Sequence, residues 1–137
     1  MNGTDIRILL VDDFELVRQL IKGILSEKGF TTVDEAENGK EAVSKIEAAQ
    51  NSSQPYHIIF CDWAMPEMSG LEVLEHIRAK AEFKEVPFIM VTAESERANV
   101  VKAIRAGATD YMKKPIEPAA LEKKVQKLVE KLRGQAA

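Results

Sequence analysis

The sequence predicts an α/β fold in which a parallel sheet is covered by helices on both faces. Short apolar runs alternate with longer stretches of helical spacing, and this strand–helix unit occurs five times. Such alternation is typical of parallel sheets, whose crossover connections are helices. The apolar runs are nearly continuous, as expected for strands that are buried on both faces. At 137 residues, the chain is expected to form a single domain over residues 1–137, with a core over about 5–133.

The first two units lie in the amino-terminal third of the chain. An apolar run between Ile6 and Val11 predicts the first strand, and residues 31–36 predict the second. The first helix has apolar residues at helical spacing, which predicts one apolar face: Val17, Leu20, Ile21, Ile24 and Leu25. Gly29 is expected to end this helix, because glycine readily adopts the left-handed conformation found there. The second helix is expected to begin near Gly39 and to carry Ala42, Val43 and Ile46.

Three further units complete the predicted fold. Strands are expected over residues 58–61, 88–91 and about 109–112. The helices that follow them carry apolar residues at helical spacing, in turn Leu71, Leu74 and Ile77, then Val100, Val101 and Ile104, and last Leu121, Val125, Leu128, Val129 and Leu132. Gly107 is expected to end the second of these helices. The polar residues 50–55 predict a surface loop, and the tail after Leu132 is predicted to fray.

Composition argues against several classes of protein. The chain has 19 basic and 22 acidic residues, a formal net charge of −3, so binding to nucleic acid is not expected. The single cysteine, Cys61, excludes an intramolecular disulfide and a multi-cysteine metal site. No apolar run approaches the roughly 18 residues of a membrane span, and no secretory leader is recognisable. We therefore expect a cytoplasmic protein without membrane contact, and a monomer.

Polar side chains follow four of the five predicted strands. Asp12 and Asp13 end the first strand, Asp62 the third and Thr92 the fourth, while the fifth runs into Lys113–Lys114–Pro115. In open α/β sheets, ligands bind outside the carboxyl ends of the strands. Taken singly, Asp13 or Asp62 could cap the following helix, and paired lysines are usually solvated. Their coincidence at one edge of the sheet favours a functional site.

The chemistry of such a site can be predicted from its groups. Two carboxylates about 4 Å apart repel by roughly 4 kcal/mol at an effective dielectric constant near 20, so three of them favour a bound cation. Oxygen ligands prefer a hard divalent ion, and a partly hydrated Mg²⁺ suits a site with few carboxylates. A carboxylate can also attack phosphorus and form an aspartyl phosphate. A lysine and a hydroxyl would then contact the phosphoryl oxygens.

These residues resemble the motifs of a known family, the receiver domain of two-component response regulators. The matching segments, in the family's order, are Ile8–Asp13 (ILLVDD), Cys61–Pro66 (CDWAMP), Met90–Glu94 (MVTAE) and Lys114–Pro115. The resemblance covers about residues 5–133, which leaves no room for an output domain. It implies a doubly wound, flavodoxin-like sheet of five parallel strands in the order 2-1-3-4-5, with five helices. Phe14, Trp63 and Tyr111 look most like the single-domain chemotaxis branch.

The resemblance implies a role for each acidic residue. Asp62 would be the phosphoacceptor, taking a phosphoryl group from a phosphohistidine of a histidine kinase. Mg²⁺ would be held by Asp13, Asp62 and the backbone carbonyl of Ala64, with Asp12 reaching it largely through water. The protein would catalyse only its own phosphorylation and slow dephosphorylation, so it would not be an enzyme acting on an external substrate.

The resemblance also implies a switch. Lys114 would pair with the phosphoryl group, Thr92 would move to hydrogen-bond it, and the ring of Tyr111 would then turn inward. Lys114 is preferred to Lys113 because the family's lysine directly precedes proline, and the Lys114–Pro115 bond is predicted to be cis. The switched surface would bind a flagellar motor switch protein through the fourth helix, fifth strand and fifth helix, including Glu96, Arg97, Val100, Tyr111, Ile116 and Lys124.

Three positions depart from the family pattern. Ala64 lies where close chemotaxis relatives often carry Asn, which leaves open the dephosphorylation rate and the action of any phosphatase. Lys113 replaces a usual apolar residue and Ile116 a usual Phe, so the identity of the target is open as well.

Two other functions share part of this chemistry. A haloacid-dehalogenase-type phosphatase also forms a Mg²⁺-dependent aspartyl phosphate, but its first strand ends in Asp-x-Asp, which Asp12–Asp13 does not supply. A receiver used as an adaptor without phosphorylation would not need the complete acidic set or Lys114.

Overall fold

Five parallel strands form one sheet in the computed structural model, which describes residues 5–93 and 97–136. The strand order is β2-β1-β3-β4-β5, and every neighbouring pair is parallel. The strands are β1 (Ile8–Val11), β2 (Val33–Ala36), β3 (Ile58–Asp62), β4 (Phe88–Thr92) and β5 (Asp110–Lys113). The predicted doubly wound, flavodoxin-like α/β fold is therefore confirmed.

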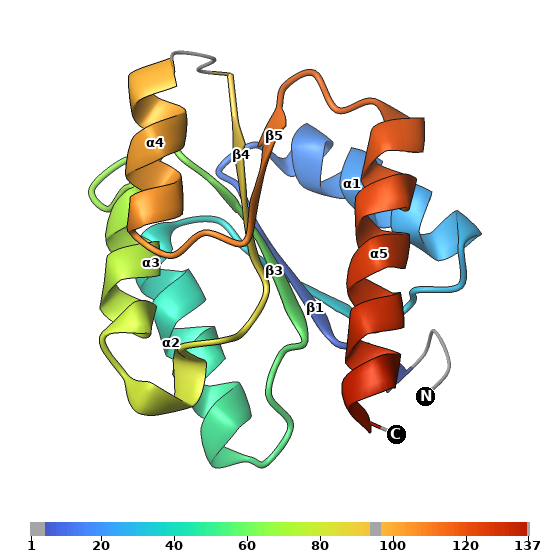
Figure 1. The fold of residues 1–137 in the computed structure, drawn as a ribbon. Helices are drawn as coiled ribbons and strands as arrows, with labels where there is room; N and C mark the ends of the chain where they lie inside the picture. Colours follow the sequence, from blue (N-terminus) through green and yellow to red (C-terminus); the bar gives the residue numbers. More distant parts are fainter. Residues whose placement is uncertain (1–4, 94–96, 137) are drawn as a thin grey trace.

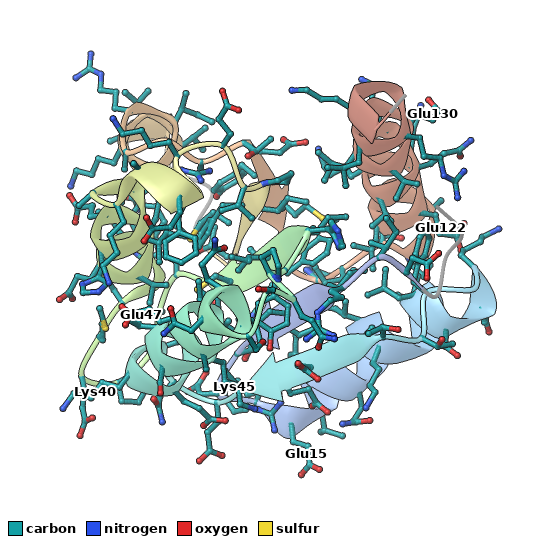
Figure 2. All side chains as sticks on the ribbon, turned by 90° about the horizontal axis from the view of Figure 1, so that it is seen from below. Glu15, Lys40, Lys45, Glu47, Glu122 and Glu130 are labelled. Carbon is teal, nitrogen blue, oxygen red and sulfur yellow. The ribbon has the colours of Figure 1, made fainter. Side chains whose placement is uncertain are left out.

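Helices cover both faces of the sheet (Figure 1). They are α1 (Glu15–Glu27), α2 (Gly39–Asn51), α3 (Gly70–Arg78), α4 (Arg97–Arg105) and α5 (Pro118–Ala136), with a short 3-10 helix, η2 (Ala81–Phe83), before β4. Helices α1 and α5 lie on one face, and α2, α3 and α4 lie on the other (Figure 1). Figure 2 shows charged side chains such as Glu15, Lys40 and Glu130 at the periphery, around the sheet.

The sheet separates two hydrophobic cores, because successive side chains of a strand point to opposite faces. In β1, Leu9 and Val11 join the core under α2, α3 and α4, whereas Ile8 and Leu10 join the core under α1 and α5. Every residue of β1, β3 and β4 is buried, as their continuous apolar runs predicted. This two-sided burial anchors the strand ends where the polar residues lie.

Helix faces and boundaries differ from the predictions at a few positions. Leu20, Val101 and Ile104 were expected on apolar helix faces, but they are 48%, 41% and 50% exposed. Among the described residues of α4 the buried one is Ala103, which lies on a different side of the helix from Val101. Helix α2 includes the first two residues of the predicted 50–55 loop, and α5 continues past Leu132 to Ala136 instead of fraying.

Glycine ends two helices as predicted. Gly29 follows α1 with φ +88°, and Gly107 follows α4 with φ +106°. Both angles lie in the left-handed region that glycine adopts without a steric penalty. These turns return the chain toward β2 and β5.

Candidate functional site

The predicted polar residues lie at one edge of the sheet, where the parallel strands end. Asp12 directly follows β1, while Asp62 and Thr92 are the last residues of β3 and β4. The strand register pairs Asp62 with Val91 and Thr92 with Lys113, so these ends are level across the sheet. In Figure 1, this edge lies at the top, where β4 and β5 lead toward α4 and α5.

Three carboxylates form the centre of the site. One oxygen each of Asp12, Asp13 and Asp62 lies within 4.8 Å of the others. Asp12 and Asp62 are buried, with 4% and 5% exposure, while Asp13 is exposed. The structure thus brings together the three acidic residues that the sequence singled out, and leaves one of them facing solvent.

Lys114 contacts two of these carboxylates. Its Nζ lies 2.8 Å from Asp12 Oδ2 and 3.3 Å from Asp62 Oδ1. Lys113, the neighbouring lysine, is exposed at the end of β5. The lysine preferred from the sequence is therefore the one at the acidic cluster, and the Lys114–Pro115 bond is cis, as predicted.

The electrostatics of the cluster are those of a partly compensated negative charge. Burial, the nearby charge of Asp12 and, to a smaller degree, Asp13 raise the pKa of Asp62 to about 6, although Lys114 acts to lower it. Burial disfavours the Lys114 ammonium, but the hydrogen bond to Asp12 and the charge of Asp62 outweigh that effect and hold its pKa above the ordinary value. One ammonium does not balance three carboxylates.

The donor set fits a hard divalent cation. Three carboxylates supply oxygen ligands within reach of one another, which are the ligands that hard divalent ions prefer. Because Asp13 is exposed, water can complete a coordination shell on the open side, as Mg²⁺ prefers. Ala64 lies exposed in the loop after β3, and the role of its carbonyl stays a prediction.

Thr92 and Tyr111 lie on neighbouring strands beside the cluster. Thr92 is buried at the end of β4, and its backbone carbonyl accepts a hydrogen bond of 2.8 Å from the backbone N–H of Lys114. Tyr111 is half-buried on β5 and packs against the core under α2, α3 and α4. Of the predicted output surface, Glu96 lies outside the described residues, as does Glu94 of the third motif (MVTAE), and the side chain of Arg97 is not described.

The helix-capping interpretation of the acidic residues is wrong. The N-cap residue of α1 is Phe14, which makes no side-chain cap, and α3 is capped by Ser69 in a capping box with Glu72. One carboxylate oxygen of Asp12, Oδ1, instead accepts a hydrogen bond of 2.9 Å from the backbone N–H of Phe14. This bond orients Asp12 within the site.

Sequence reasoning missed three residues that support the site. A Cβ on Gly70 would lie 2.2 Å from the backbone oxygen of Asp62, so only glycine lets α3 begin this close to β3. Arg18 donates from Nη1 to the backbone oxygen of Asp12, at 2.6 Å, and from Nε to Glu35 Oε1, at 2.8 Å. The position of Gly70 shortly after Asp62 was a usable signal, whereas neither Arg18 nor Glu35 stands out in the sequence.

Comparison with known proteins identifies the family. The family model of the response regulator receiver domain matches residues 8–126, most of the chain. The chain belongs to the response regulator receiver domain family. Within it, this receiver domain is 39% identical over 120 residues to the chemotaxis protein CheY1 of Helicobacter pylori, which covers 88% of this chain and 94% of that protein.

Solved structures agree with this assignment. The chemotaxis response regulator CheY4 of Vibrio cholerae has a TM-score of 0.80 and 30% identity, covering 90% of this chain and 98% of the other. CheY in a complex with CheX, BeF₃ and Mg²⁺ from Borrelia burgdorferi has a TM-score of 0.80 and 27% identity, over 90% and 89% of the two chains. The receiver domain is therefore of the CheY type. No helix among the described residues is long and apolar enough to cross a membrane.

Proposed function

We propose that this receiver domain is a phosphorylation-switched signalling protein in which Asp62 accepts a phosphoryl group from a histidine kinase. The observation that carries the proposal is the convergence of Asp12, Asp13, Asp62 and Lys114 at one edge of the sheet. Asp62 is buried within this cluster and its pKa is raised to about 6, so it is mostly ionised, and hence nucleophilic, at neutral pH.

The transfer step uses the Asp62 carboxylate as nucleophile. A carboxylate oxygen attacks the phosphorus of a phosphohistidine, a new P–O bond forms, and the P–N bond breaks with its electron pair left on the imidazole nitrogen. Lys114, now 3.3 Å from Asp62, pairs with the phosphoryl oxygens, and Thr92 approaches them with its hydroxyl group. Both residues act on charge that shifts during transfer.

Mg²⁺ is the cofactor that this proposal includes. Asp13 and Asp62 would hold it, with the carbonyl of Ala64, and Asp12 would reach it largely through water. When bound, the ion neutralises negative charge on the carboxylates and on the incoming phosphoryl group. Hydrolysis of the aspartyl phosphate returns the protein to its starting state, so no external substrate is turned over.

The two alternative functions are less well supported. A haloacid-dehalogenase-type phosphatase has a first strand that ends in Asp-x-Asp, whereas neither Asp12 nor Asp13 after β1 is followed by a second Asp two residues on. An adaptor that is never phosphorylated would gain nothing from burying Asp12 and Asp62 side by side, because such burial destabilises the fold.

The target surface of the proposed switch is formed by α4, β5 and α5. Val101 and Ile104 on α4 are exposed apolar residues, and Lys113 on β5 is exposed as well. The names of the similar proteins support a role in chemotaxis. The target included in this proposal is a flagellar motor switch protein, as the resemblance to the chemotaxis branch implies. The complex of a CheY with CheX supports a second protein partner for this receiver domain. A phosphatase that acts on the phosphorylated form is the partner that this proposal includes.

Intact-mass measurement tests the phosphorylation. The protein is incubated with Mg²⁺ and acetyl phosphate, and we expect a mass increase of one phosphoryl group. Asp62→Asn should abolish the adduct, whereas the matched control Asp34→Asn, a carboxylate on β2 that bonds Tyr56, should retain it. Absence of the adduct in the native protein, or its survival in Asp62→Asn, would overturn the proposal.

A binding assay tests the target. A peptide from a flagellar motor switch protein is titrated into the receiver domain with and without Mg²⁺ and beryllofluoride, a phosphoryl mimic. We expect tighter binding with the mimic, because phosphorylation shifts the surface toward its binding form. Equal affinities in the two states would contradict the chemotaxis assignment while leaving phosphorylation intact.

A further inference from the structure

Arg18 joins the loop after β1 to the end of β2. It is the fourth residue of α1, and its side chain is only 12% exposed. From this position, Nη1 donates to the backbone oxygen of Asp12 at 2.6 Å, and Nε donates to Glu35 Oε1 at 2.8 Å. One planar guanidinium group thus ties a residue of the acidic cluster to the neighbouring strand.

Glu35 is itself held in place by several groups. Its carboxylate also lies 3.2 Å from Gln19 Nε2 and 3.4 Å from Lys22 Nζ, and Lys45 Nζ donates to its backbone oxygen. Residues of α1 and α2 therefore hold Glu35 of β2, the residue that pairs with Arg18. Because Glu35 is held in this way, the guanidinium of Arg18 can orient the Asp12 carbonyl that it also contacts.

The contact with Asp12 acts on Asp13 as well. The carbonyl of Asp12 and the N–H of Asp13 belong to one planar peptide unit. A hydrogen bond to that carbonyl therefore also restricts the orientation of the backbone at Asp13. The Asp12 side chain is held independently, through the Phe14 N–H at 2.9 Å and Lys114 Nζ at 2.8 Å. Arg18 supplies the hydrogen bond to the backbone between the two acidic residues.

We propose that Arg18 is a positioning residue for cation binding. Its guanidinium orients the Asp12–Asp13 peptide so that both carboxylates lie within 4.8 Å of an oxygen of Asp62. This inference rests on the proposed function, because it concerns the Mg²⁺ site assigned there. It adds a residue that would touch neither the ion nor the phosphoryl group.

Loss of the Arg18 charge and loss of its contact with Asp12 should change the Mg²⁺ affinity in opposite directions. Removing a cation beside an acidic cluster should, by charge alone, strengthen Mg²⁺ binding. Loss of positioning should weaken it. Lys22 is the matched control, because it is a cation on the same helix that pairs with the same Glu35 carboxylate. Arg18→Met and Lys22→Met change the net charge equally, but only Arg18 bonds the Asp12 carbonyl.

Calorimetric titration with Mg²⁺ alone tests the inference. We expect Arg18→Met to bind Mg²⁺ about tenfold more weakly than the native protein, and Lys22→Met to bind it equally or more tightly. Thermal unfolding in a chelator identifies folded variants. Should Arg18→Met fail to fold, Arg18→Lys replaces it in the titration. We expect Arg18→Lys to bind Mg²⁺ more weakly as well, because a single ammonium cannot make both guanidinium contacts.

Phosphorylation kinetics provide a second readout. The Mg²⁺ concentration that half-saturates the rate of phosphorylation by acetyl phosphate should rise in Arg18→Met, while the rate at saturating Mg²⁺ should recover to within about twofold. Equal Mg²⁺ affinities of Arg18→Met and Lys22→Met overturn the role of Arg18 alone. Absence of Mg²⁺ binding by the native protein overturns the proposed metal site, and this inference with it.

Discussion

Asp62 is the residue at which stability and the proposed function conflict. Its carboxylate is buried next to Asp12, and both effects raise its pKa to about 6, whereas Lys114 compensates only in part. The ionised form is therefore disfavoured in the folded, metal-free protein relative to the unfolded chain. A nucleophile must nevertheless be ionised to attack phosphorus, so the fold is less stable than it would be with a neutral side chain at this position.

We predict that Asp62→Asn stabilises the metal-free protein by about 2 kcal/mol at pH 7.5. The folded-state pKa lies above the ordinary value of 3.8, so the destabilisation is fully present above about pH 6 and disappears as the pH falls toward 4. Urea unfolding in a chelator at several pH values measures the difference. Asp110→Asn, which breaks the partly exposed pair with Lys124, is the control and should change stability by less than about 1 kcal/mol. A gain for Asp62→Asn that grows toward pH 4 would contradict the prediction.

At the scale of single elements, the start of α3 determines how close the helix comes to the acidic cluster. Ser69 and Glu72 form a capping box that begins the helix at Gly70. The N–H of Gly70 bonds the carbonyl of Trp63 at 2.8 Å, and the absent side chain leaves room for the backbone of Asp62. The cap and the glycine together hold the loop after β3 against the strand that ends in Asp62.

Two helical glycines should respond to alanine in opposite ways. Gly70→Ala places a methyl group 2.2 Å from the Asp62 backbone oxygen, so we expect a loss of about 3 kcal/mol. A methyl group on Gly23, within α1, would meet no atom within 4 Å, so Gly23→Ala should stabilise the protein by about 0.5–1 kcal/mol. Denaturant unfolding of both variants measures these changes. Equal effects would show that the close approach of α3 to β3 does not matter.

At the scale of the whole molecule, the two cores surround strands that end in uncompensated charge. Every residue of β1, β3 and β4 is buried, so the strand ends cannot move apart to relieve the repulsion among Asp12, Asp13 and Asp62. A cation that binds only the folded state should therefore stabilise the entire domain. Binding at one edge is coupled to global stability in this way.

We predict that Mg²⁺ at a hundred times its dissociation constant stabilises the domain by about 2.7 kcal/mol relative to a chelator. Sodium chloride at the same ionic strength is the control for screening, and it should have a smaller effect. Asp13→Asn, which removes the exposed ligand, should reduce the gain from Mg²⁺. Thermal unfolding measures all three. Equal stabilisation by the two salts would argue against a specific site.

The fold could be predicted largely from local patterns, and the site only in part. Continuous apolar runs predicted the buried strands β1, β3 and β4, and glycines past the ends of helices predicted the turns at Gly29 and Gly107. Apolar spacing was less reliable for helix faces, as Leu20 shows, since the width of the buried stripe depends on what packs against it.

The sequence by itself determined which residues reach one edge of the sheet, because a strand of a parallel sheet delivers its last side chain to the carboxyl end whatever else surrounds it. Only the tertiary structure decided the contacts made there. The ammonium of Lys114 lies between Asp12 and Asp62, residues separated from it by 102 and 52 positions, and Arg18 reaches both Asp12 and Glu35. Such contacts depend on strand register, helix rotation and the close approach at Gly70, which are set by packing across the whole chain.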